Sequence, residues 1–343
     1  MTLVAGKPLV ETVQALSSNL AICILLAAAV TDFIVGDPWG WPHPVRLIGW
    51  CISLYAKLAL RWISSAQGQF IAGIFLGIGL PFGMAWLSGF MLSIFYGLSS
   101  VLGTGVAITL MASCWATKSL RKAAEDVMHG LKARNLSQAR SQLQYYVGRD
   151  TENLTETEVL RALLECISEN ATDGVFAPFF YAVLGLLLSA QWGAALAISY
   201  KALSTLDSMV GYQTVPYTYL GRFSARFEDV MTWLPCRLTV VTIALLSGSF
   251  YKVIAICKRD AAADPSPNSG WSECVYAAAL DVQLGGLNYY QGKPRYKPLL
   301  GDDVQPISIE KIQQALALTR YGFLLWLVLG ISLLAFRYHI HCG

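Results

Sequence analysis

The stretch Leu160–Tyr181, LRALLECISENATDGVFAPFFY, joins a charged helical pattern directly to an apolar one. Its first half places four charged side chains at successive intervals of four residues: Arg161, Glu165, Glu169 and Asp173. On a helix they share one stripe, because four residues advance by about 400°. The second half turns apolar without a linker, and Pro178 falls where the first turn of a new helix is expected. Acids at the mouth of a membrane segment are costly unless they meet a cation or substrate, so the stripe is the first candidate site.

The composition of the chain indicates an integral membrane protein. Hydrophobic residues make up 55% of the 343 residues and charged residues 14%, against roughly 25% charged in ordinary globular proteins. The net charge of +3 is too small to suggest a nucleic-acid partner. Six apolar segments approach or reach the roughly 20 residues that span a bilayer: about Leu20–Val35, Phe70–Leu87, Gly89–Ala116, Val175–Tyr200, Leu234–Ile256 and Ala315–Phe336. They predict one all-α polytopic domain over 1–343, with about 5–6 transmembrane helices and the lipid bilayer as a partner.

Basic residues are distributed unevenly between the two sides that this topology implies. With the N-terminus outside, the regions 36–69, 117–174 and 257–314 are cytoplasmic and hold three, eight and six Lys or Arg residues. This excess predicts a multi-pass protein of the cell membrane with a cytoplasmic active site. A helical cytoplasmic insert is expected at about 117–174 and a polar loop region at about 257–314. Segment 201–233 would lie outside unless Val175–Tyr200 dips into the membrane and returns.

The cytoplasmic insert is expected to contain three helices. The first covers Lys118–Lys132, Ser137 caps the second, which stops near Gly148, and the pair Thr155–Glu158 forms a capping box that opens the third. The third is predicted to run to Gly174, which puts Glu169 and Asp173 in its last turns. Acids are disfavoured there by the exposed carbonyls, so a divalent metal or a cationic group would offset the repulsion, and the hard oxygen ligands suit Mg²⁺.

Asn170 adds a neutral donor and acceptor beside Glu169. The alternative for the stripe is an ion-pair ladder, in which Arg161 neutralises Glu165 and the remaining acids are solvated.

Three further segments combine polar side chains with restricted backbone. The segment Asp32–Trp50 presents Asp37, His43 and Arg46 on a loop stiffened by glycine and proline, and interfacial anchoring by its tryptophans is the alternative. The segment Lys201–Leu238 carries Asp207 and Arg237 near membrane helices, and here the alternative is a polar connector.

The third segment is Lys258–Trp271, in which Ser266, Asn268, Ser269 and Gly270 form a polar turn. Turns of this kind present backbone N–H groups to anions, which predicts phosphate binding, while a helix N-cap before Glu273 is the alternative.

Taken together, these motifs resemble the CobD/CbiB family of cobalamin biosynthesis, the adenosylcobinamide-phosphate synthases. The matching pieces occur in the family's order and cover most of Asp32–Gly301: GDPWGWPHPVRLIG, GRDTENLTETEVLRALLECISENATDGVFAPFFY, TLDSMVGY, Arg226 with Glu228–Asp229, Pro235–Arg237–Leu238, RDAAADPSPNSG and LGGLNYYQG. The chain departs from the family at Ser204, where Asn is usual, and at Glu228 and Thr232, where Asp and Asn are usual.

The resemblance implies a membrane-bound, ATP-dependent ligase that joins an amino-alcohol phosphate, typically 1-amino-2-propanol phosphate, to adenosylcobyric acid. The corrinoid is then a substrate rather than a cofactor, ATP is a cosubstrate with Mg²⁺, and other late enzymes of the cobalamin pathway are potential partners. In this hypothesis Glu169, Asp173 and Asp229 hold Mg²⁺, with Asp207 as a further acid near ATP. Glu165 or Asp37 acts as general base, and Asn170 belongs to the catalytic group. The expected substrate and phosphate ligands are His43, Arg46, Arg149, Asp150, Arg237, Ser266, Asn268, Ser269 and Gly270.

Two other function classes fit some of the same residues. A secondary transporter would also place acids near apolar spans, although the candidates concentrate in long extramembrane segments and no inverted repeat is visible. A non-catalytic regulatory protein of the same fold is the other alternative, and the nearly complete set of polar motifs argues against it.

Overall fold

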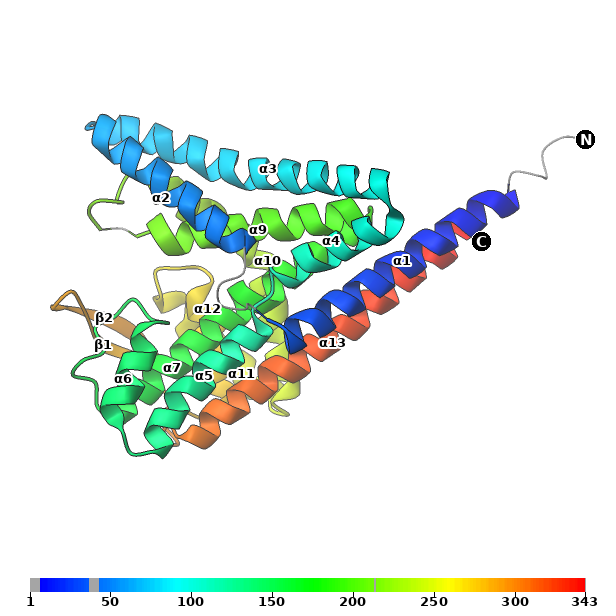
Figure 1. Ribbon diagram of the computed structural model, residues 1–343. Helices are drawn as coiled ribbons and strands as arrows, with labels where there is room; N and C mark the ends of the chain where they lie inside the picture. Colours follow the sequence, from blue (N-terminus) through cyan, green and yellow to red (C-terminus); the bar gives the residue numbers. More distant parts are fainter. Residues whose placement is uncertain (1–6, 37–42, 213, 343) are drawn as a thin grey trace, which may run out of the picture. The chain divides into compact units, whose positions relative to one another are not determined.

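The computed structural model describes residues 7–36, 43–212 and 214–342, with side chains from Asn19 to Arg337 within those ranges (Figure 1). It divides into two compact units. The first comprises Met1–Trp115, Ala177–Glu228 and Leu325–Gly343, and the second comprises Ala116–Phe176 and Asp229–Leu324. That the chain forms one domain stays a prediction.

The first unit is a bundle of apolar helices. Its elements are α1 (Lys7–Ile34), α2 (Pro44–Trp62), α3 (Ala66–Leu98), α4 (Ser100–Ala112), α8 (Ala177–Leu186) and α9 (Ala190–Val210), with the start of α10 (Arg222–Leu246) and the end of α13 (Ile309–Cys342). Helix α9 lies at the centre and packs against α2, α3, α4 and α8. A Cβ atom added to Gly73 of α3 would lie 2.1 Å from the carbonyl oxygen of Leu220, so this close approach requires glycine.

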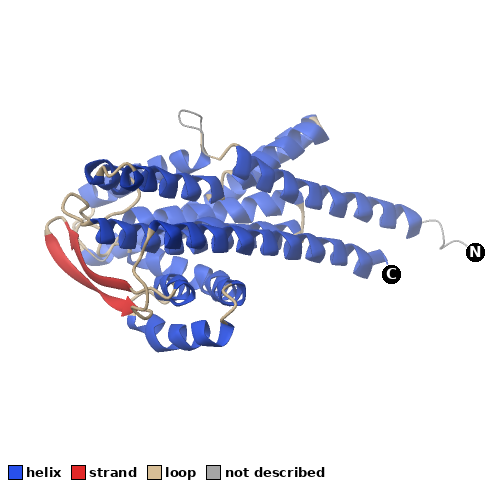
Figure 2. Ribbon diagram, turned by 90° about the horizontal axis from the view of Figure 1, so that it is seen from below, coloured by secondary structure: helices blue, strands red, loops and turns tan. Residues whose placement is uncertain are grey.

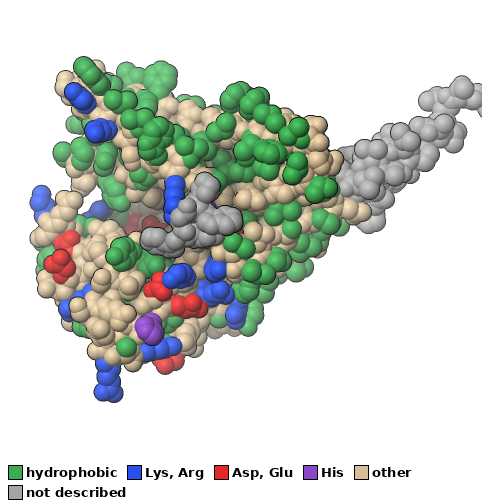
Figure 3. Space-filling model, in the orientation of Figure 1, with side chains coloured by type: hydrophobic (Ala, Val, Ile, Leu, Met, Phe, Trp, Pro, Cys, Tyr) green, Lys and Arg blue, Asp and Glu red, His purple; other side chains and the backbone are tan. Residues whose placement is uncertain are grey.

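The surface of α3 is that of a helix in lipid. Large hydrophobic side chains are exposed along one broad side of it, among them Phe75, Phe82 and Trp86, and the space-filling view shows hydrophobic side chains on this part of the surface (Figure 3). A helix that is apolar all round and still exposed is typical of a membrane span. Within the residues that the structure describes, four stretches are long and apolar enough to cross a membrane: Ala66–Leu98, Ser100–Lys132, Arg222–Leu246 and Ile309–Arg337, with a shorter apolar helix at Asn19–Ile34. The prediction of an all-α polytopic membrane protein is confirmed.

Several predicted span boundaries are wrong. The expected break at Leu87–Gly89 does not exist, because α3 continues to Leu98 and Ser99 both ends it and caps α4. The predicted span Leu234–Ile256 is instead the end of α10 and most of α11 (Phe250–Asp260), separated by a turn in which Gly248 has φ +73°.

The expected span Val175–Tyr200 also divides into two helices. Helices α8 and α9 are joined by a short turn at Leu187–Ser189 and pack against each other. Ten residues make α8 only about 15 Å long, roughly half a bilayer core. Two packed helices in place of one span are what the alternative of a segment that dips and returns requires, and the side of the membrane on which 201–233 lies stays a prediction.

The second unit combines short helices with one β-hairpin. Its elements are α5 (Thr117–Lys132), α6 (Leu136–Gln144), α7 (Glu156–Ala171), a π-helix (Thr172–Phe176), α11, a 3₁₀ turn (Ala261–Ala263), α12 (Ser269–Leu280), β1 (Leu284–Tyr290) and β2 (Lys293–Leu300), with parts of α10 and α13. The two strands pair antiparallel, with an irregularity between Leu284 and Gly286 (Figure 2). The hairpin lies in the region that was predicted as a polar loop, and the sequence analysis did not predict it.

The caps of the short helices are partly as predicted. Thr155 and Glu158 form the reciprocal capping box at the start of α7, so that prediction is confirmed. The second helix is capped by Asn135, whose side chain accepts a hydrogen bond from Gln138 N at 3.0 Å, and not by Ser137. It ends at Gln144 rather than near Gly148.

Helix α7 does not end at Gly174, so that prediction is wrong. It is followed directly by the π-helix Thr172–Phe176 and then by α8, which has Pro178 in its first turn. Asp173 therefore does not lie at a helix C-terminus with exposed carbonyls. A π-turn has more residues than an α-turn, so Asp173 also leaves the stripe that spacing by four predicts. Single π-turns inside helices are frequent at functional sites, so the segment Thr172–Phe176 remains a candidate for function.

Candidate functional site

A buried carboxylate on α7 ties this helix to the β-hairpin of the second unit. Glu165 accepts hydrogen bonds from the guanidinium of Arg149 and from Gly285 N, the latter at 2.9 Å, and it pairs with Arg161 at 3.3 Å. Arg149 is 6% exposed and also donates to Asn288 Oδ1 at 2.6 Å. Because both oxygens of Glu165 accept strong bonds, its position is fixed.

Arg161 extends the same connection along β1. Its guanidinium donates to the carbonyl oxygens of Gly285 and Leu287, at 3.0 Å in the second case, and to Asn288 Oδ1 at 3.2 Å. The predicted ladder between Arg161 and Glu165 is therefore present, but it continues into the hairpin. The two arginines and Glu165 form one network that holds β1 on α7.

The electrostatics of this network keep Glu165 ionised. Burial disfavours the charged carboxylate, but Arg149, Lys297 and Arg161 outweigh it and hold the pKa of Glu165 below its ordinary value. The same pairing raises the pKa of Arg149 in spite of its burial. A carboxylate with a depressed pKa and fully occupied oxygens is a poor proton acceptor, so Glu165 fits a positioning role better than the predicted role of general base.

A second buried carboxylate joins α12 to β2. Glu273 has no exposed surface, and its Oε1 accepts a hydrogen bond from Lys297 Nζ at 2.6 Å. Within the described part of the chain, Oε2 of Glu273 has no hydrogen-bond partner. Burial raises the pKa of Glu273 to about 8. The positive charge of Lys297 acts to lower this pKa, and the negative charges of Glu165 and Glu169 act to raise it.

Lys297 retains its proton as well. Burial would lower its pKa, but Glu273, Glu169 and Glu165 together hold the pKa of the ammonium above its ordinary value. Both members of the pair thus bind their protons more tightly than free side chains do.

The exposed end of the stripe carries an acid that the network does not use. The side chain of Glu169 is exposed and makes no hydrogen bond or ion pair with the described residues. Asn170 is also exposed and donates to Cys166 O at 2.9 Å, while Asp173 is half-buried in the π-helix. Glu169 is therefore the carboxylate of the stripe that could meet a cation, and a cation contact of Asp173 stays a prediction.

No preformed metal cage is present among residues 7–36, 43–212 and 214–342, since no three His, Cys, Asp or Glu side chains gather there. Mg²⁺ commonly binds through one or two carboxylates, waters and substrate phosphates, so Glu169 and Asp173 fit this mode without a cage. The third predicted ligand, Asp229, accepts a hydrogen bond from Ser266 Oγ at 3.1 Å through its Oδ1. A metal at these residues stays a prediction.

The predicted phosphate turn is held by its own hydrogen bonds. Ser266 Oγ accepts from the backbone N–H groups of Asn268 and Ser269, each at 3.2 Å, and Asp264 accepts from Ser266 N at 2.9 Å. Helix α12 begins at Ser269, and Asn268 occupies the N-cap position without a capping hydrogen bond from its side chain. Phosphate binding by Ser266, Asn268, Ser269 and Gly270 stays a prediction, and it would require some of these bonds to exchange.

Arg237 is held beside this turn. Its guanidinium donates to Pro267 O at 2.9 Å and lies 4.4 Å from the ring centre of Trp271 and 5.4 Å from that of Trp233. Stacking on aromatic rings fixes a guanidinium while leaving some of its five N–H groups for a ligand. This geometry is compatible with the predicted phosphate contact.

Asp150 has a different use. Its two carboxylate oxygens accept from Gln291 N at 2.9 Å and Gly292 N at 2.7 Å, and its own N–H donates to Tyr289 O at 2.8 Å. These bonds hold the turn of the hairpin. Asp150 thus has a structural role in the hairpin, and its substrate contact stays a prediction.

The other predicted site residues belong to the first unit or lie outside the described residues. Asp37 falls in the segment that is not described. His43 is the N-cap residue of α2, and its Nδ1 accepts from Val45 N at 3.3 Å, while Arg46 is exposed in the first turn of that helix. Asp207 is half-buried near the end of α9, with its side chain against Gly211.

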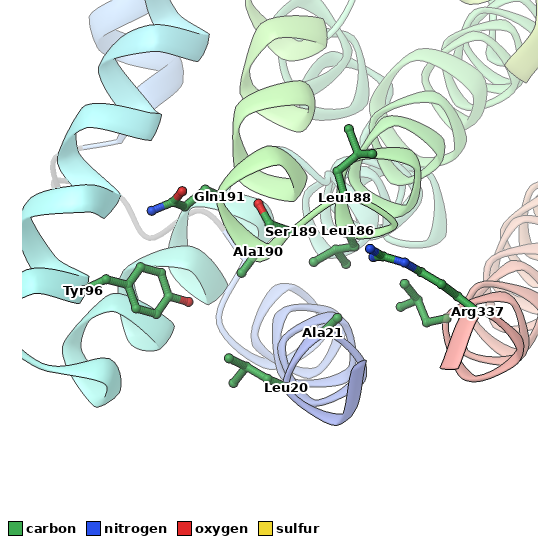
Figure 4. A pocket seen from close by; sticks show the side chains of 10 residues that line it. Leu20, Ala21, Tyr96, Leu186, Leu188, Ser189, Ala190, Gln191 and Arg337 are labelled. Atoms are coloured by element: carbon green, nitrogen blue, oxygen red, sulfur yellow. The ribbon is translucent and has the colours of Figure 1, made fainter. Parts of the chain in front are cut away.

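A cavity of about 290 Å³ also lies in the first unit, between α1, the end of α3, the α8–α9 turn and α13 (Figure 4). Its walls are mostly apolar, and Arg337 reaches toward Leu186 and Leu188. None of the predicted site residues lines it. The cavity therefore adds no support to the predicted site.

Sequence reasoning missed Glu273, Lys297 and Asn288. One signal was available for Glu273, because it is the single charged residue of α12, SGWSECVYAAAL. An acid inside an apolar helix needs a partner, by the same logic that singled out the stripe. For Lys297 and Asn288 the sequence offered no comparable signal, since their positions depend on the hairpin.

Comparison with known proteins gives the same family as the motifs. The profile described as CobD/CbiB protein matches residues 25–319. The chain belongs to the CobD/CbiB family. It is 49% identical over 315 residues to the cobalamin biosynthesis protein CobD of Synechocystis sp., covering 92% of each chain.

Relatives from other bacteria agree. The chain is 39% identical to the cobalamin biosynthesis protein CbiB of Salmonella arizonae over 87% of this chain and 92% of that protein. It is 37% identical to the cobalamin biosynthesis protein CobD of Halalkalibacterium halodurans, over 90% of this chain and 96% of the relative. No solved structure shows significant similarity to the chain. This CobD/CbiB protein is therefore a cobalamin biosynthesis protein with several candidate membrane helices.

Proposed function

We propose that this CobD/CbiB protein is a membrane-bound ligase that forms an amide between adenosylcobyric acid and an amino-alcohol phosphate of the 1-amino-2-propanol phosphate type. The product is adenosylcobinamide phosphate, and ATP with Mg²⁺ drives the condensation. Membership of the family supports the pathway. The observation that carries the reaction class is the charge arrangement in the second unit, where the exposed carboxylate of Glu169 and the partly exposed side chain of Lys297 lie on α7 and on the hairpin that the Glu165 network joins to α7.

Amide formation needs this combination of charges. A carboxylate must be activated, an ammonium must lose a proton, and the charges of phosphate groups must be balanced. Lys297 and Arg237 supply cations for anionic groups, while Glu169 and Asp173 supply anions for a metal or an amine. When bound, Mg²⁺ would be held by Glu169 or Asp173 and would neutralise the phosphates of ATP.

The buried network gives these groups fixed positions. Glu165 is held by two arginines and by Gly285 N, so α7 and β1 cannot shift independently. Because Glu169 follows on α7 and Lys297 lies on the paired strand β2, the network sets the spacing between the two. Glu165 and Arg149 are positioning residues in this account.

The test uses the full-length protein in lipid nanodiscs with adenosylcobyric acid, 1-amino-2-propanol phosphate, ATP and Mg²⁺. The proposal expects ATP consumption that requires both other substrates. ATP consumption that ignores the corrinoid, or its absence with every amine tested, would contradict it. The transporter alternative is tested with the same protein in proteoliposomes, where uptake of corrinoid without amide formation would support transport.

A further inference from the structure

We infer that Lys297 and Glu169 bind the two ends of one zwitterionic ligand, the phosphate group on Lys297 and the ammonium group on Glu169. The inference rests on the proposed function and assigns the amino-alcohol phosphate to these two residues of the second unit. Sequence analysis had assigned Glu169 to a metal and had no role for Lys297.

The first observation is that the side chain of Lys297 is partly exposed and has N–H donors without a partner. Its side chain is 20% exposed, and among the described residues its only hydrogen bond and ion pair go to Glu273. A lysine ammonium has three N–H donors. Two of them are therefore available to a ligand.

The second observation is the partner that holds Lys297. Glu273 is wholly buried, so it cannot meet a ligand of its own, and one of its oxygens has no partner within the described residues. Burying a carboxylate so incompletely bonded is costly. The cost is understandable if Glu273 serves to hold the ammonium of Lys297 in place on β2.

The third observation concerns Glu169. Its side chain is exposed and makes no hydrogen bond or ion pair with any described residue. Glu169 lies one helical turn after Glu165 on α7, and Lys297 pairs with Gly286, the residue after the Gly285 whose N–H binds Glu165. Glu169 and Lys297 therefore flank the same network without forming an ion pair with each other, and Glu169 contributes to the raised pKa of Lys297.

The other charged groups nearby are already paired with one another, which helps to define the ligand. Glu165 pairs with both Arg149 and Arg161, so its carboxylate is not available to a guest, although the three groups together keep one positive charge. A cation and an anion remain, each with unused bonding capacity. A small molecule with a phosphate at one end and an ammonium at the other matches both at once.

The experiment measures binding of three probes to the full-length protein in nanodiscs by equilibrium dialysis. The probes are 1-amino-2-propanol phosphate, isopropyl phosphate, which lacks the amine, and 1-amino-2-propanol, which lacks the phosphate. The variants are Lys297→Met and Glu169→Gln. The matched controls are Lys293→Met on the same strand and Glu156→Gln on the same helix, both exposed.

Each variant should affect one end of the ligand. Loss of a charge-assisted hydrogen bond is expected to weaken binding roughly tenfold to a hundredfold. Lys297→Met should therefore weaken the binding of the zwitterion and of isopropyl phosphate but not the binding of 1-amino-2-propanol. Glu169→Gln should weaken the binding of the zwitterion and of 1-amino-2-propanol but not the binding of isopropyl phosphate. Both control variants should bind all three probes with the affinity of the wild type.

Two results would overturn the inference. One is unchanged affinity of both variants for the zwitterion. The other is a Glu169→Gln protein that needs more Mg²⁺ for activity but keeps its affinity for the zwitterion, because Glu169 would then be a metal ligand. Failure of the proposed function looks different, since the wild type would then form no amide with any amine.

Discussion

Nζ of Lys297 lies 2.6 Å from Oε1 of Glu273, a carboxylate that has no exposed surface and whose other oxygen has no partner among the described residues. The pair joins β2 to α12 across 24 positions of sequence. It combines an inaccessible acid with a partly accessible base. The acid is thereby a positioning group for the base.

Two replacements of Glu273 should distinguish the effect of its charge from the effect of its hydrogen bond with Lys297. Glu273→Gln keeps an acceptor oxygen for Lys297, so affinity for 1-amino-2-propanol phosphate should fall by no more than about fivefold, the worth of one ordinary hydrogen bond. Glu273→Leu removes the acceptor and should lower affinity and activity by more than about tenfold. Equal effects of the two variants on the KM for this substrate would contradict a positioning role.

The same residue should make stability depend on pH. Its folded pKa of about 8 lies above the ordinary value of 4.5, so folding favours the protonated form. The stabilising contribution is complete below pH 4.5 and is lost as the pH rises through about 8. As the pH rises through this interval, the Tm of the wild type should therefore fall relative to the Tm of Glu273→Gln, which does not titrate at this position. Parallel Tm curves for the two proteins would show that Glu273 does not titrate there.

The buried network around Glu165 should be a large contributor to stability. Glu165→Ala leaves Arg149 buried without its anionic partner, and removal of one partner from a buried pair costs about 3–5 kcal/mol. Thermal unfolding in nanodiscs measures the loss. The control is Glu125→Ala, because Glu125 forms an exposed pair with Arg121 at 3.7 Å, and such pairs contribute roughly 0–1 kcal/mol. A similar Tm for both variants would contradict the account of the network.

The start of the hairpin should not tolerate a side chain. Gly285 has φ +89°, and a Cβ atom there would lie 1.9 Å from the carbonyl oxygen of Pro298. Gly285→Ala should therefore displace β1 from α7 and reduce activity by more than about tenfold, since strain of this kind alone costs about 1–3 kcal/mol. Gly292→Ala is the control, because φ is +74° there but no atom lies within 4 Å of the added Cβ. Full activity of Gly285→Ala would argue against a fixed hairpin.

The features that could be predicted from the sequence are those that depend on residues close together along the chain. The capping box of Thr155 and Glu158 follows from four consecutive residues, and the membrane class follows from the long apolar segments. The contact between Arg161 and Glu165 follows from helical spacing, and the structure confirms it.

The sequence could not predict features that depend on tertiary pairing. The π-helix at Asp173 changes the helical period where spacing by four assumed an unbroken one. The α8–α9 turn is a three-residue break in an otherwise apolar run, and length alone favours a single span. Lys297 reaches Glu273 only because β1 and β2 pair, and no period of the sequence encodes that register.

Mass-spectrometric detection of the corrinoid product tests the central claim most directly. The wild-type protein in nanodiscs is incubated with adenosylcobyric acid, 1-amino-2-propanol phosphate, ATP and Mg²⁺, beside Asp173→Asn and Glu169→Gln. The account predicts adenosylcobinamide phosphate from the wild type only when ATP is present, and strongly reduced product from both folded variants. Product formation without ATP, or full activity in both variants, would contradict it.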